Sequence, residues 1–178
     1  MRLEKTFLEI DVLDMEVIVS QSTAASLEKL VKRKPYSREL EESVVREIIK
    51  TTDGAAGIVF LMDLDMDQFV DSGRESLKRA LDAKMIGKAE YDRVHAGLPE
   101  WFGFLKERGM REGDRLGYRG GQRGLRTLFH DAKQAKLLDM THGGPAPLRT
   151  MLASYYPPGG ELREPLVRSL FDDRQASR

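Results

Sequence analysis

Residues 57–81 read Gly57-Ile-Val-Phe-Leu-Met-Asp-Leu-Asp-Met-Asp-Gln-Phe-Val-Asp-Ser-Gly-Arg-Glu-Ser-Leu-Lys-Arg-Ala-Leu81, and the other segments must pack on what they form. The continuous apolar run Ile58–Met62 is typical of a β-strand buried on both faces. Asp65 and Gln68 are spaced as the two halves of a capping box, which predicts that a helix begins there. The apolar stripe of that helix consists of Met66, Val70, Gly73, Leu77, Ala80 and Leu81. We therefore predict a strand that leads directly into a helix.

The composition is that of an ordinary globular protein. The chain has 178 residues, of which 40% are hydrophobic and 33% are charged. We expect one domain over residues 1–171 and a frayed polar tail at 172–178. The formal net charge is zero, so electrostatics does not favour nucleic acid or an anionic membrane as a partner. No cofactor is predicted, and the sequence leaves the oligomeric state open.

The distribution of apolar and acidic residues indicates where in the cell the protein is located. No apolar run reaches the roughly 20 residues that a membrane-spanning helix needs, so we expect no membrane span. Acidic side chains interrupt any signal-peptide core near the start: Glu4, Glu9, Asp11, Asp14 and Glu16. The sequence as written predicts a cytoplasmic protein. A periplasmic location would follow if an N-terminal signal had been trimmed.

The strand signals predict an antiparallel sheet. Residues 7–19 alternate between apolar and polar, which indicates one long strand that is bulged or broken near Asp14. The segments 112–119 and 125–129 flank the glycine-rich turn 120–124 and predict a β-hairpin. A third strand is expected over 136–140. Together with the helices this gives the α+β class.

The helix signals are equally local. Ser22 is expected to cap a helix that ends at Val31, and Ser37 a helix that Gly54 ends in the left-handed conformation. The helix after Asp65 is expected to run to about Met85 with Gly87 as its terminator. The other expected helices are Ala89–Leu105, broken near Gly97–Pro99, then Pro147–Tyr156 and Leu162–Leu170.

Two patterns look like binding motifs, but a structural explanation fits each better. Asp63, Asp65 and Asp67 alternate as in a calcium loop, yet Gln68 and Arg74 stand where an EF-hand needs Gly and Glu, so we favour capping. The Gly117–Gly124 stretch carries arginines but does not open a helix, so we favour a hairpin turn over a phosphate site. The three histidines lie far apart in the sequence and predict no metal site: His95, His130 and His142.

Four segments in order carry a resemblance. They are the strand at 7–19, Val59–Phe69 leading into its helix, Gly113–Gly124, and Pro147–Leu152 before a Pro-Gly turn and Glu161–Leu166. Over about residues 5–171 their order and spacing resemble the bacterial branch of the chalcone isomerase-like family. The resemblance implies an open-faced β-sandwich, with a large antiparallel sheet and helices layered on one face. It also implies a cleft between sheet and helices, which holds a flavonoid in the enzymes and a fatty acid in related binding proteins.

The resemblance assigns five ligand-binding positions. Asp11 falls where the family has a Thr, Phe69 where it has a Tyr, and Thr150 where it has Ser or Thr. Ser72 and Ser76 replace a Lys and an Asn. The family's Arg on an earlier strand has no counterpart. Phe69 and Thr150 are expected to face the same cleft.

These replacements remove most of the groups that would stabilise an oxyanion. The resemblance therefore implies a non-catalytic protein that binds a small apolar or amphipathic ligand, such as a fatty acid or a flavonoid-like compound. Two alternatives stay open. One is an intramolecular lyase, which is a type of isomerase, with altered active-site residues. The other is a scaffold or interaction domain whose cleft is filled by its own side chains.

Overall fold

The computed structural model describes residues 9–10 and 13–172. Six antiparallel strands form one sheet in chain order: β1 (Glu9–Ile10), β2 (Leu13–Val19), β3 (Gly54–Phe60), β4 (Arg115–Gly121), β5 (Gly124–His130) and β6 (Lys136–Gly143). Because β1 has two residues, β2 to β6 make up most of the sheet. The structure confirms the α+β class with an antiparallel sheet.

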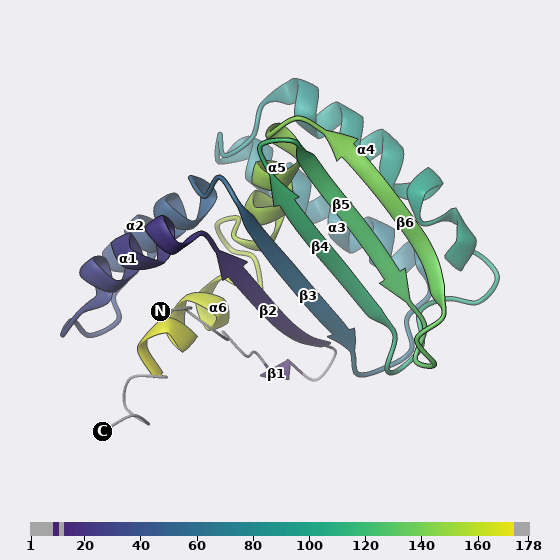
Figure 1. Ribbon diagram of the computed structural model, residues 1–178, viewed down its shortest axis with the longest axis horizontal. Coiled ribbons are helices and arrows are strands. Elements are labelled where there is room, and N and C mark those ends of the chain that lie inside the picture. Colours follow the sequence, from purple (N-terminus) through teal and green to yellow (C-terminus); the bar gives the residue numbers. More distant parts are fainter. Residues whose placement is uncertain (1–8, 11–12, 173–178) are drawn as a thin grey trace.

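The helices fall into three groups along the chain. They are α1 (Gln21–Val31) and α2 (Arg38–Ile49) between β2 and β3; α3 (Met66–Asp82), α4 (Lys88–Trp101) and the 3₁₀ helix η1 (Gly103–Leu105) between β3 and β4; and α5 (Ala146–Tyr155) and α6 (Arg163–Asp172) after β6. Figure 1 shows α3, α4 and α5 behind the sheet, and none of the described helices in front of it. Within the described residues, no helix combines the length and apolar character of a membrane span.

The two faces of the sheet differ because side chains alternate along each strand. On the covered face, Met15, Ile58, Leu116 and Phe129 are paired from strand to strand in one row, and all four are buried. On the uncovered face, Gly57 pairs with a glycine of β4, and arginines of β4 and β5 pair beside them. The core therefore lies between the sheet and the helix layer.

The prediction for the central strand was wrong in bounds and burial. β3 begins at Gly54 and ends at Phe60, and its side chains alternate between buried and half-buried. Leu61 and Met62 lie beyond it and are 37% and 42% exposed. The sheet is covered on one face only, so a strand buried on both faces has no place in it. Gly54 does not end α2 in the left-handed conformation; it starts β3, where a Cβ would lie 2.7 Å from the backbone oxygen of Ile18.

The helix caps follow local sequence closely. The Asp65 carboxylate accepts the Gln68 backbone N–H at 2.7 Å, and the Gln68 amide oxygen accepts the Asp65 N–H at 3.2 Å, which confirms the capping box. Ser37 caps α2 as predicted. The cap of α1 is Ser20, not Ser22. Asp82 ends α3, and Gly87 caps the start of α4 where a terminator was expected.

The predicted break near Gly97–Pro99 is absent from the described residues. α4 continues through Pro99 to Trp101. A proline cannot donate to the carbonyl four residues back, but that carbonyl, of His95, accepts from Arg74 Nε at 3.3 Å instead. The predicted long strand is divided shortly before Asp14: β1 and β2 are separate strands that pair antiparallel with each other, with Ile10 opposite Leu13. Within β2, Asp14 pairs with Val59 in an unbroken ladder, so no bulge lies there. The predicted hairpin of β4 and β5 and the strand β6 are confirmed; β5 and β6 are longer than expected, whereas β4 begins later, at Arg115, and continues to Gly121.

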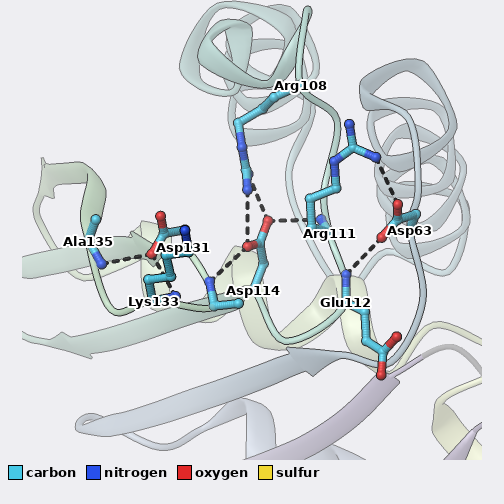
Figure 2. A network of polar contacts seen from close by, with 9 residues as sticks. Asp63, Arg108, Arg111, Glu112, Asp114, Asp131, Lys133 and Ala135 are labelled. Carbon is cyan, nitrogen blue, oxygen red and sulfur yellow. Dashed lines mark hydrogen bonds and ion pairs between the residues drawn. The ribbon is translucent and has the colours of Figure 1, made fainter.

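A buried carboxylate holds the loops at one end of the sheet (Figure 2). Asp114 is fully buried and accepts two hydrogen bonds from the Arg108 guanidinium, at 2.7 and 3.1 Å. It also accepts the backbone N–H groups of Arg111 at 2.9 Å and Ala132 at 3.1 Å. The neighbouring Asp63 accepts from the Arg111 side chain at 2.8 Å. These contacts fix the β3–α3 loop and thereby the start of α3.

A second ion cluster fastens the C-terminal helix. Arg163 is 4% exposed and donates to Glu41 and Glu42 of α2 and, at 3.0 Å, to the carbonyl of Tyr156. Burial together with hydrogen bonding to Glu41 raises the pKa of Tyr36 to about 12. Asp172 is the last residue of α6, and the rest of the expected tail lies outside the described residues.

Candidate ligand-binding cavity

A cavity of about 330 Å³ lies between the covered face of the sheet and the helix layer. Apolar side chains form most of its wall, and they come from segments throughout the chain: Leu13, Ile58, Phe60, Leu64, Phe69, Leu77, Val94, Leu98, Trp101, Phe102, Leu125, Met140, Pro147, Met151 and Leu162. The volume falls within the range of natural small-molecule sites, which is about 300–1,000 Å³. The cavity is therefore large enough for a small ligand.

One wall comes from α3. Phe69, Ser72 and Ser76 line the cavity, and their spacing of three and four residues places them on one side of the helix. The capping box sets the phase of this helix, because it fixes where the first turn begins. Ser72 is exposed and marks the rim, whereas Ser76 and Phe69 are half-buried and lie further in. The capping box, a pattern of only four residues, thus sets which α3 side chains face the cavity.

Phe69 contributes an apolar surface to this wall. Its ring meets Phe102 edge to face at a centroid distance of 4.9 Å and Phe60 at 6.2 Å. Such contacts orient a ring as well as bury it. Phe69 does not fill the cleft, because the cavity of about 330 Å³ remains beside it.

Thr150 lines the same cavity from α5. It is buried, and its hydroxyl donates to the carbonyl of Ala146 at 3.0 Å. This bond one turn back along the helix is common for threonine, and the hydroxyl oxygen keeps lone pairs that can accept from a ligand. Four of the five expected binding residues thus lie on one cavity wall or another. Asp11, the fifth, lies outside the described residues.

Two tyrosines on the wall were missed from the sequence. Tyr118 on β4 and Tyr155 on α5 line the cavity, and their rings lie 6.3 Å apart. Burial raises the pKa of Tyr118 to about 12 and that of Tyr155 well above its usual value, and their hydroxyls are hydrogen-bonded to each other. Both phenols therefore stay protonated at neutral pH. The alternation of β4 places Tyr118 beside buried Leu116, which was the available sequence signal.

His142 and Arg93 were also missed. His142 lies on the edge strand β6 with its ring 4.3 Å from that of Trp101, at 50°. Arg93 is exposed and reaches the same cavity from α4. Burial, followed by the nearby positive charge of Arg93, lowers the pKa of His142. The imidazole is therefore neutral at pH 7.

No known family model matches the chain, and no curated protein matches it either. The site must therefore be judged from its own geometry. No group of three or more His, Asp or Glu side chains within the described residues is arranged to hold a metal ion. The cavity wall offers apolar contact, protonated hydroxyls, one neutral imidazole and a guanidinium at the rim.

Proposed function

We propose that the protein binds one small apolar or amphipathic ligand in this cavity, and that its domain is of the chalcone isomerase-like type. The ligand class is a fatty acid or a flavonoid-like compound. The observation that carries the proposal is the shared cavity of Phe69, Ser72, Ser76 and Thr150. These residues come from two helices far apart in the sequence, yet they surround one space.

The mainly apolar lining of the cavity supports a ligand that is itself mainly apolar. Burial of apolar ligand surface contributes roughly 25 cal/mol per Å², and a few hydroxyls suffice to orient it. A scaffold with a closed cleft would instead need its own side chains in this space, and Phe69 leaves the space open. The geometry therefore favours binding over the scaffold alternative.

Native mass spectrometry of protein purified from its host tests the proposal. We expect a stoichiometric ligand, which Ser76→Phe should displace because a phenyl ring at this half-buried position occupies the cavity. Asp71→Phe is the matched control, since it adds the same ring to an exposed position of the same helix. Absence of a ligand in the wild-type protein, together with no binding of added dodecanoic acid or naringenin, would overturn the proposal.

One observation favours the isomerase alternative. Tyr118 and Tyr155 line the cavity with phenols that stay protonated at neutral pH, and phenols can donate to an oxyanion as it develops. These groups supply donors that Phe69 lacks. An absorbance assay of chalcone cyclisation distinguishes the two functions, because only an isomerase gives turnover that Tyr118→Phe or Tyr155→Phe reduces.

A further inference from the structure

The side chain of His142 holds a buried polar atom whose bonding capacity is unused. Its Nε2 is the one buried side-chain nitrogen or oxygen without a hydrogen-bond partner among the described residues. Leaving a buried polar atom unpaired destabilises a protein, so this nitrogen needs an explanation. The residue lines the cavity and its ring packs on Trp101. A ligand atom in the cavity is the partner that this position can reach.

The charges on the cavity wall show which kind of ligand atom fits there. Two lining residues carry a formal charge at neutral pH, Arg93 on α4 and Glu161 on the segment before α6. Arg93 shares the α4–β6 side with His142, and its charge is close enough to lower the pKa of that imidazole. An anionic group is attracted to Arg93 and repelled by Glu161.

We infer that the ligand is a monocarboxylate whose carboxylate lies between His142 and Arg93, with its apolar part directed inward along Phe69 and Leu77. This inference rests on the proposed function and names the ligand's polar group and its place. His142 donates from Nε2, and the guanidinium adds a charge-assisted hydrogen bond or ion pair.

The protein contains its own reporter for this position. Trp101 is the single tryptophan of the chain, and its ring contacts that of His142 at 4.3 Å between centroids. Intrinsic fluorescence therefore monitors ligand binding beside the imidazole. Titration with dodecanoic acid and with dodecan-1-ol compares two ligands that share a tail and differ in the polar group.

We expect wild-type protein to bind the acid at least about tenfold more tightly than the alcohol. Arg93→Gln and His142→Leu should each weaken acid binding by about tenfold and change alcohol binding by less than about twofold. Arg93 is exposed, so its replacement keeps the test valid even if the His142 variant folds poorly. Lys88→Gln is the matched control, because it removes an exposed positive charge from the same helix outside the cavity lining, and it should leave the preference intact.

The outcomes separate the two proposals. If neither compound binds the wild-type protein, the proposed function fails. If both bind equally well, binding stands and the carboxylate inference is overturned. A preference for the acid that survives Arg93→Gln and His142→Leu but disappears in Tyr155→Phe would place the carboxylate at the tyrosine pair and would also overturn the inference.

Discussion

Replacing Asp114 with alanine should destabilise the protein by about 3–5 kcal/mol, the usual cost of removing one partner of a buried ion pair. Asp114 is 0% exposed and accepts four hydrogen bonds, two from Arg108 and one each from the backbone N–H groups of Arg111 and Ala132 (Figure 2). Alanine removes both acceptor oxygens and with them all four hydrogen bonds. The loop before β4, which holds Arg108 and Arg111, and the β5–β6 loop, which holds Ala132, then lose their common partner.

The magnitude can be worked from the groups left behind. The Arg108 side chain is 30% exposed, so its charge can turn toward water and contributes little to the loss. The two backbone N–H groups, of Arg111 and Ala132, point at the buried carboxylate and cannot turn away as freely. Each donor that loses its partner costs up to about 1–3 kcal/mol. Asp114→Asn should cost less than Asp114→Ala, because its amide oxygen still accepts from part of the set.

Urea denaturation monitored by circular dichroism measures this change, and thermal unfolding should show a fall of about 10 °C for a chain of this size. Asp82→Ala is the control, because it removes a carboxylate from an exposed ion pair with Lys78, and such pairs contribute little. If Asp114→Ala shifts the unfolding midpoint no more than Asp82→Ala does, the carboxylate does not hold these loops together.

Three further predictions concern the cavity and its surroundings. Leu77 is 3% exposed and borders the cavity, so Leu77→Ala should cost about 2–5 kcal/mol in chemical denaturation; a cost under about 1 kcal/mol, similar to that of the exposed Leu137→Ala, would contradict its buried position. An NMR titration should give His142 a pKa below 6.5 that rises in Arg93→Gln, and a pKa above 6.5 would contradict the buried environment. Because the imidazole of the unfolded chain binds a proton more tightly than that of the folded protein, His142 should destabilise the fold as the pH falls below 6.5. The protein should not accelerate chalcone cyclisation in an absorbance assay, and turnover that Thr150→Ala abolishes would refute this.

The sequence predicted those parts of the fold that short-range patterns encode. The capping box of Asp65 and Gln68, the cap at Ser37 and the glycine hairpin between β4 and β5 depend on residues within a few positions of each other. The strand β3 was misplaced because its first half, Gly54 to Gly57, consists of glycine and alanine, which have low strand propensity. Those residues pair with β2 and β4, and that context overrides their local preference.

The residues of the candidate site were likewise only partly predictable from the sequence. The family resemblance singled out Phe69, Ser72, Ser76 and Thr150, and the structure places them around one cavity. Nothing local marks His142, since a lone histidine in a strand is unremarkable until its burial is known.

By itself the sequence thus determined where helices and turns begin, because capping and periodicity act over one or two turns of chain. Only the tertiary structure decided which side chains are buried together. Asp114 meets Ala132, and Trp101 meets His142, across 18 and 41 positions of sequence (132 − 114 and 142 − 101). Burial and electrostatic environment arise from contacts between such distant residues. They leave Nε2 of His142 without a hydrogen-bond partner and raise the pKa of Tyr118.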